Sequence, residues 1–180
     1  MWNVLYSTSY QNVTQSNSPL PHTELIDGTL FHMELPDRIH QEICFSLSRK
    51  IADYIDSHSA AGKVYPAPFA VFLNGDSTTY VEPDISVICN KEKLIAEGCN
   101  GAPDWIVEVV SSTSQRMDYF VKLFRYRIAG VREYWIVNPM KQTVQVYSFH
   151  AEGNSMQFSF DDMIKAGIYD NLFIRISDFL

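Results

Sequence analysis

The feature that most restricts how this chain can fold is a pair of apolar runs separated by a helix. Trp105–Val110 is apolar except for one acid, and Glu133–Asn138 is a second apolar run of similar length. Between them, Ser112–Ser114 offer capping oxygens for a helix over 115–129, and Gly130 is placed to end it. Strand, helix and strand at this spacing predict a right-handed βαβ unit whose two strands are parallel and covered on both faces.

The rest of the chain predicts further strands and one long helix around this unit. Apolar residues recur every four positions from Ile39 to Ile55, which is typical of an amphipathic helix. The other predicted elements are a hairpin over Glu24–Glu34 with its turn at Asp27-Gly28, strands at Lys63–Leu73 and Asp84–Cys89, a hairpin from Thr143–Phe149 and Met156–Phe160 around Glu152–Asn154, and a closing strand near Phe173–Ile176. We therefore expect an α/β fold with a mixed (α+β) sheet and β-hairpins near both ends.

The size and composition are those of one globular domain. Of the 180 residues, 46% are hydrophobic and 19% charged, and we expect a domain over 23–180 preceded by a polar N-terminal arm at 1–22. No apolar run is long enough for a membrane helix, the first residues lack a signal-peptide pattern, and the three cysteines lack metal-ligand spacing. These observations predict a cytoplasmic protein with reduced thiols.

The overall charge limits the classes of partner. The formal net charge is -7, which argues against a general polyanion binder because such proteins usually carry a basic surface. It does not exclude a nuclease, since bound metal ions neutralise carboxylates locally.

Two acids stand out because of where they lie. Asp84 begins a predicted strand, and Glu108 lies inside the apolar run 105–110. An ionised carboxylate among apolar side chains is costly unless it is paired or binds a metal ion. Glu108 is therefore a candidate metal ligand, but it could instead face a solvent-filled cleft, or pair with Arg125 or Lys122.

The predicted helix after the second acid carries a local excess of positive charge. Residues 116–141 contain six Lys or Arg and only two acids, although the whole chain is acidic. Asp118 and Lys122 are four residues apart and can form an ordinary helix ion pair. The basic side chains either form a solvated helix face or bind phosphate, and Arg116 and Arg125 are the candidates for phosphate binding.

Several stretches of the sequence resemble a known family. They are Pro83–Cys89, Gly101–Ser111, Asp118–Lys122 and Ala129–Pro139, with a further likeness at Glu24–Gly28 and His40-Gln41. Together they resemble the Uma2 family (DUF820), which is grouped with the PD-(D/E)XK nuclease superfamily. The resemblance implies a restriction-endonuclease-like core, in which helices flank a mixed β-sheet.

The resemblance implies roles for individual residues. Asp84 matches the first metal-binding aspartate, and Glu108 matches the acid of the (D/E)XK element. Two residues later the superfamily usually has lysine, but this chain has Val110. The family pattern places its lysine in the following helix, where Lys122 matches it and Asp118 matches the accompanying acid.

Further positions are implied to support this site. The backbone carbonyl of Val109 is an additional candidate metal ligand. Glu42 is the acid that could assist from the first helix, as in many members of the superfamily, and His40 is in a family-like position with a structural or supporting role. The segment Ser111–Ser114 lacks the proline that is common in the family, which affects the helix entry more than the chemistry.

The residues and the resemblance together predict a DNA endonuclease that depends on Mg2+ or Mn2+. Two carboxylates suit hard divalent cations, and Lys122 can orient the attacking water. Two alternatives stay open, namely a non-catalytic interaction module with the same fold, and a phosphoesterase acting on RNA or a nucleotide. None of the five histidines has zinc-ligand spacing. Because restriction-like nucleases cut two strands, we also expect a homodimer, and no membrane partner.

Overall fold

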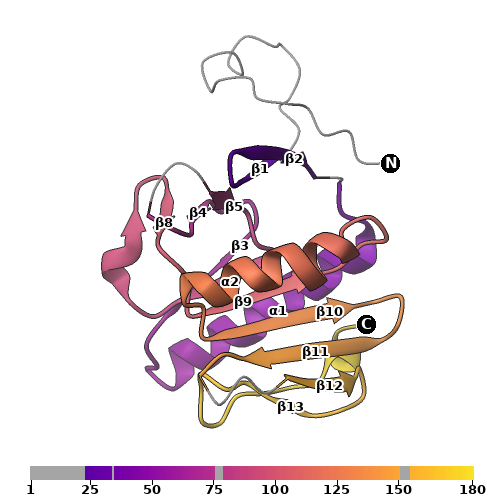
Figure 1. Cartoon of the computed structure of the whole chain (residues 1–180). Coiled ribbons are helices and arrows are strands. Elements are labelled where there is room, and N and C mark those ends of the chain that lie inside the picture. The colour runs from indigo at the N-terminus through magenta and orange to yellow at the C-terminus, as the bar shows by residue number, and fades with distance from the viewer. Residues whose placement is uncertain (1–22, 34, 76–78, 151–154) are drawn as a thin grey trace.

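The centre of the protein is a six-stranded mixed β-sheet (Figure 1). The computed structural model describes residues 23–33, 35–75, 79–150 and 155–180. The strands of this sheet are β3 (Lys63–Pro66), β6 (Ile85–Ile88), β9 (Trp105–Val109), β10 (Glu133–Asn138), β11 (Thr143–Ser148) and β12 (Ser155–Ser159). Their order is β12-β11-β10-β9-β6-β3. β9 and β10 are parallel and the other pairs are antiparallel, so the predicted mixed sheet, βαβ unit and C-terminal hairpin are confirmed.

Helices cover both faces of this sheet (Figure 1). Helix α1 (Arg38–Ser57) lies on one face, and the crossover helix, which ends in α2 (Leu123–Ala129), lies on the other. Alternate side chains of β9 pack into two separate cores, because successive residues of a strand point to opposite faces. Val107 packs in the core that contains α1, and Ile106 in the core that contains α2.

Helix α1 agrees closely with the predicted span of 39–55. Its inner face buries Ile43, Leu47 and Ile51 completely, as the four-residue periodicity predicts. Asp37 caps its start, because its side chain accepts a 2.8 Å hydrogen bond from the backbone N–H of His40. In this first turn, Nε2 of His40 lies 3.1 Å from Oδ2 of Asp84, the residue before β6, so the start of α1 lies at this end of the sheet.

The crossover helix differs from the regular α-helix predicted for 115–129. Met117–Lys122 form a π-helical segment, which continues into α2. π-helical turns in α-helices are rare and often lie at functional sites. Asp118 and Lys122 are both buried, not on a solvated helix face. Gly130 ends the helix in the left-handed conformation, with φ of 92°.

A second sheet of six short strands contains the predicted N-terminal hairpin. Its strands are β1 (Thr23–Ile26), β2 (Thr29–His32), β4 (Val71–Phe72), β5 (Tyr80–Val81), β7 (Leu94–Ile95) and β8 (Gly98–Asn100). They lie in the order β2-β1-β5-β4-β8-β7, and β1 pairs with β2 through the turn at Asp27-Gly28. Short 3-10 helices at Lys91–Lys93 and Ile176–Phe179, and a pair of strands, β13 (Ile164–Lys165) and β14 (Phe173–Ile174), complete the described elements.

The single strand predicted over Lys63–Leu73 is wrong. The structure divides this stretch between β3 in the central sheet and β4 in the second sheet. β3 ends at Pro66, and Pro68 follows before β4 begins. Proline cannot donate to a strand ladder, so the chain leaves one sheet before it joins the other. The apolar pattern alone did not show this interruption.

Two predicted segments lie outside the described residues, namely the N-terminal arm at 1–22 and the turn at 152–154. Within the described part, the three cysteines are free thiols, and Cys44 and Cys99 are buried. No helix there has the length and apolar character needed to span a bilayer.

Candidate active site

A cleft of about 940 Å³ lies at the end of the central sheet where β9 finishes and β6 begins. The second strand of the N-terminal hairpin, the start of α1 and the segment 111–116 border it. Asp84, Glu108 and Val109 line this cleft together with His40. The structure therefore brings the three predicted metal ligands into one cavity.

Asp84 lies at the end of the central sheet, between helix α1 and the end of β9. It directly precedes β6, and β6 pairs antiparallel with β9, so its side chain reaches the end of β9. Its Oδ2 accepts a 2.7 Å hydrogen bond from the backbone N–H of Val109 and lies 3.1 Å from Nε2 of His40. Asp84 is thus fixed beside Val109 by the strand pairing, while part of its side chain stays open to the cleft.

Glu108 is buried on the α2 face of the sheet. Its Oε1 accepts a 2.6 Å hydrogen bond from the Tyr126 hydroxyl and a 3.0 Å hydrogen bond from Nζ of Lys122. Its Oε2 lies 3.4 Å from the backbone N–H of Asp84. Burial raises the pKa of Glu108 well above its usual range, and the charges of Asp118 and Asp84 act in the same direction against the opposing effect of Lys122.

Lys122 is held beneath Glu108 by three carboxylates. Its Nζ lies 2.9 Å from Oε1 of Glu24, 3.0 Å from Oε1 of Glu108 and 3.8 Å from Oδ1 of Asp118. Burial alone would lower the pKa of Lys122, but these three carboxylates raise it well above its ordinary value. The ammonium is therefore charged, and only 1% of its side chain is exposed. Lys122 does not line the cleft and reaches it through Glu108.

Glu24 and Tyr126 belong to this network, although sequence reasoning missed both. Glu24 lies in β1, is fully buried, and also accepts a 2.9 Å hydrogen bond from the backbone N–H of Glu82. Tyr126 lies one helical turn after Lys122, and burial together with the Glu108 charge raises the pKa of its hydroxyl, which stays a proton donor. The available signals were an acid inside the family-like hairpin strand and a tyrosine four residues after the lysine.

Two other predicted residues do not reach the cleft. Glu42 pairs with Arg38 at 2.5 Å on the outer side of α1, and 44% of its side chain is exposed. Arg125 pairs with Asp27 in the turn of the N-terminal hairpin. Of the two arginines predicted to bind phosphate, Arg116 lines the cleft and Arg125 does not.

In place of Glu42, helix α1 presents His40 and Cys44 to the site. The Cys44 sulfur lies 3.5 Å from Nδ1 of His40, and one donor atom each from His40, Cys44 and Asp84 lies within 4.8 Å of the other two. Burial lowers the pKa of His40, but its hydrogen bond to Asp84, the charges of Asp84 and Asp37, and a backbone hydrogen bond at Val109 raise it above the usual value overall. The Asp84 carboxylate thus favours the protonated form of the His40 imidazole.

The donor set fits a hard divalent cation. Asp84 and Glu108 offer carboxylate oxygens and Val109 a backbone carbonyl, and oxygen ligands of this kind suit Mg2+ and Mn2+. Three carboxylates, those of Glu24, Glu108 and Asp118, surround Lys122, and Asp84 lies beside Glu108. The residual negative charge favours a bound cation at the mouth of the network.

The pKa of Asp118 predicts how stability depends on pH in the absence of metal. Burial raises this pKa from 3.8 to about 6, against the opposing effects of Lys122 and a hydrogen bond from Ser114. The folded state therefore binds a proton that the unfolded chain has lost. The free energy of unfolding is expected to fall as the pH rises from about 4 to about 6, by at most about 3 kcal/mol from this group.

Urea unfolding at a series of pH values, in the presence of a chelator, measures this effect. In Asp118→Asn, the part of this pH-dependent fall in stability that comes from Asp118 should disappear. The exposed control Asp53→Asn should show the same fall as wild type. The prediction would be contradicted if the difference in free energy of unfolding between wild type and Asp118→Asn stayed constant over this pH range.

Residues 9–165 match the model of the Uma2 family, which is described as "Putative restriction endonuclease". The chain belongs to the Uma2 family. No curated protein matches it.

The Uma2 fold is also found in a solved structure. The crystal structure of a "putative nuclease belonging to DUF820" from Anabaena variabilis ATCC 29413 superposes with a TM-score of 0.74 and 20% sequence identity. The match covers 88% of this chain and 89% of that chain. The restriction-endonuclease-like fold class predicted from the sequence is confirmed.

Proposed function

We propose that this Uma2 protein is a metal-dependent endonuclease that hydrolyses phosphodiester bonds in DNA. The observation that carries the proposal is the meeting of Asp84 and Glu108 in one cleft, with Lys122 in contact with Glu108 behind it. The match to a family described as restriction endonucleases supports the same reaction class.

The proposed cation is Mg2+ or Mn2+, held by Asp84, Glu108 and the carbonyl of Val109. Such an ion stabilises charge on the phosphoryl oxygens and lowers the pKa of a bound water. The protein fixes the two carboxylates from adjacent strands, so their separation is set by the sheet and not by flexible loops.

The remaining residues have roles in orientation. Lys122 holds Glu108 through a 3.0 Å contact, and we propose that its charge orients the water activated beside that carboxylate. Asp118, Glu24 and Tyr126 hold Lys122 and Glu108 in place.

An arginine, Arg116, lines the cleft beside its acidic residues. It is proposed to bind a backbone phosphate. Arg125 could contribute to phosphate binding only if it left its ion pair with Asp27.

Plasmid nicking tests the proposal. With Mg2+ or Mn2+, wild type is expected to convert supercoiled plasmid to the open-circular form, and a chelator should stop the reaction. Asp84→Asn should reduce the rate by at least about 100-fold, because it removes a ligand charge worth several kcal/mol at the transition state. The exposed control Asp53→Asn should keep wild-type activity. Metal-dependent cleavage that persists in Asp84→Asn would contradict the proposed site.

Two other functions have an observation in their favour. Lys122 is buried and already paired, as in a purely structural ion-pair network, which favours a non-catalytic interaction module. The volume of the cleft, about 940 Å³, is within the usual range for small-molecule sites and favours a nucleotide or short RNA as substrate.

Two measurements separate these alternatives. Calorimetric titration with Mg2+ and Mn2+ should show heat that depends on Glu108 if the site binds metal, and none if the protein is only an interaction module. A panel of duplex DNA, RNA and nucleotides separates the endonuclease from the phosphoesterase. The expected homodimer is tested by the mass from sedimentation at micromolar concentration.

A further inference from the structure

Helix α1 brings two non-oxygen donors to the rim of the cleft. His40 and Cys44 are four residues apart, so they lie on the same face of the helix, one turn from each other. This face is turned toward Asp84, whose Oδ2 lies 3.1 Å from Nε2 of His40. Imidazole nitrogen, thiol sulfur and carboxylate oxygen therefore converge from α1 and from the segment before β6.

We propose that His40, Cys44 and Asp84 form a site for a transition-metal ion of the Zn2+ class. This site is distinct in its ligands from the proposed Mg2+ site and shares only Asp84 with it. Metal binding at this site does not depend on whether the protein is a nuclease.

The His40–Cys44 pair of donor atoms already has the separation that such an ion needs, and Asp84, which contacts the opposite ring nitrogen of His40, would close on the ion from within 4.8 Å. Zn2+ bonds to nitrogen and sulfur of about 2.0–2.3 Å place the ligand atoms of a tetrahedral site about 3.3–3.8 Å apart. Nδ1 of His40 and Sγ of Cys44 are 3.5 Å apart, and one donor atom of each of the three residues lies within 4.8 Å of the others. Three protein ligands leave one position of a tetrahedral ion open.

The chemistry of the donors selects against Mg2+. Mg2+ prefers oxygen ligands in octahedral geometry, whereas imidazole and thiolate favour Zn2+, Co2+ and related ions. Neither the histidines nor the cysteines have zinc-ligand spacing among themselves. The candidate site combines a histidine and a cysteine on one helix with an acid 40 residues after the cysteine, which only the fold brings together.

Cys44 is buried but lies beside open space. A small cavity of about 180 Å³ is bounded by Cys44, Gln41, Ala67 and Asp84, and the last three residues also line the large cleft. Asp84 thus lies between the two spaces, and an ion can approach the sulfur from this side. Because both proposed sites use Asp84, Zn2+ is expected to compete with Mg2+.

Cobalt titration of the metal-free full chain tests this proposal without any activity measurement. Co2+ replaces Zn2+ in such sites, and a thiolate ligand to Co2+ produces a near-ultraviolet charge-transfer band. Wild type is expected to show this band, and Zn2+ should abolish it at far lower concentration than Mg2+. Cys44→Ser should lose the band. His40→Gln should keep sulfur ligation but weaken Co2+ binding by about tenfold or more.

Cys89→Ser is the matched control, because Cys89 is a thiol that hydrogen-bonds to Ala61, away from the cleft. It should keep the band. No band in wild type, or a band that persists in Cys44→Ser, would overturn the proposal. If circular dichroism shows that Cys44→Ser does not fold, the test rests on wild type, Cys89→Ser and His40→Gln. Unchanged Co2+ binding in His40→Gln would then overturn the proposed site. A cobalt band in a protein without nuclease activity supports this site and contradicts only the proposed function. Nuclease activity in a protein without the band contradicts only this site.

Discussion

Replacing Glu108 by glutamine is expected to reduce Mg2+-dependent plasmid nicking by at least about 1,000-fold. Glutamine has nearly the same shape but no charge, so it removes one of two carboxylates proposed to hold the cation. A loss of several kcal/mol of charge stabilisation at the transition state corresponds to an effect of this size. Single-turnover rates of supercoiled plasmid loss measure it directly.

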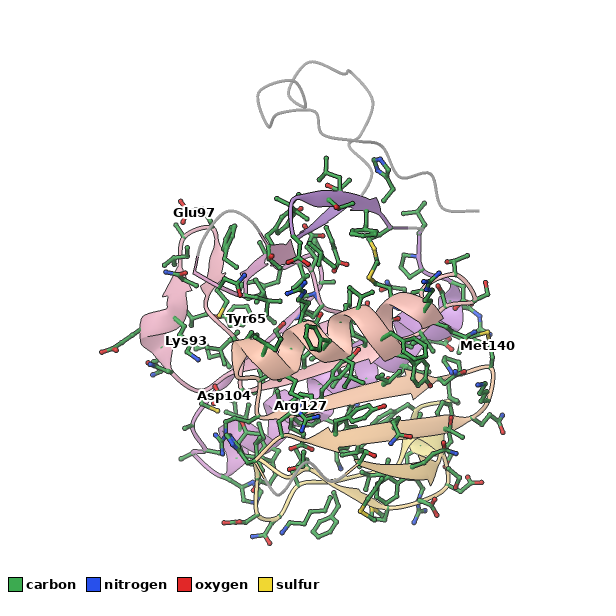
Figure 2. All side chains as sticks on the ribbon, viewed as in Figure 1. Tyr65, Lys93, Glu97, Asp104, Arg127 and Met140 are labelled. Carbon is green, nitrogen blue, oxygen red and sulfur yellow. The ribbon has the colours of Figure 1, made fainter. Side chains whose placement is uncertain are left out.

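The matched control is Glu97→Gln, because it makes the same chemical change at an exposed position. Glu97 lies in the turn between β7 and β8, at the outer edge of the second sheet (Figure 2). It should leave nicking unchanged. Circular dichroism spectra of Glu108→Gln and wild type establish that the fold is retained. Equal nicking rates in Glu108→Gln and wild type would refute the role of Glu108, whereas inactivity of all three proteins would shift the interpretation to the interaction module.

Replacing Lys122 by methionine is expected to lower the free energy of unfolding by about 3–5 kcal/mol, because it leaves buried carboxylates without their counter-charge. Glu24 and Glu108 lie 2.9 and 3.0 Å from the ammonium and would face each other unpaired. Methionine fills a similar volume, so the effect arises from charge and not from a cavity. Urea unfolding at neutral pH, without metal, measures the loss.

A second substitution distinguishes charge from packing. In Lys122→Met combined with Glu24→Gln, one of the unpaired carboxylates is neutral, and part of the lost stability should return. The coupling between the two positions is expected to be on the order of 1–3 kcal/mol. The exposed lysine variant Lys91→Met is the control and should change stability by less than about 0.5 kcal/mol. Additive effects of Lys122→Met and Glu24→Gln would show that the two side chains are not coupled.

The two acids of the site could be predicted from local sequence, because each contradicts its surroundings. Glu108 interrupts an apolar strand, and Asp84 precedes a short β-rich run in a family-like string. The predicted βαβ unit placed Glu108 beside its crossover helix, and one of the alternatives considered was its pairing with Lys122. The βαβ unit and the burial of Glu108 are confirmed, because periodicity and strand composition depend on neighbours in the chain, whereas the roles of the two acids in catalysis stay predictions.

Other parts of the site depended on contacts between distant segments. Glu24 lies 98 residues before Lys122 in the chain, and no local pattern distinguishes a hairpin acid that is buried from one that is exposed. Glu42 and Arg125 illustrate the opposite error. Both have suitable side chains in suitable elements, but the rotation of α1 and the packing of the hairpin direct them to Arg38 and Asp27.

The sequence by itself determined the βαβ unit, the amphipathic first helix and the identity of the two acids, because these follow from the spacing of apolar and charged residues along the chain. Only the tertiary structure decided which partners those acids have. Register between β6 and β9 places Asp84 beside Val109, and the π-helical segment buries Lys122 under Glu108. The direction in which a side chain points at the end of a sheet depends on how the strands pair and how the helices are rotated. Packing over the whole domain sets both.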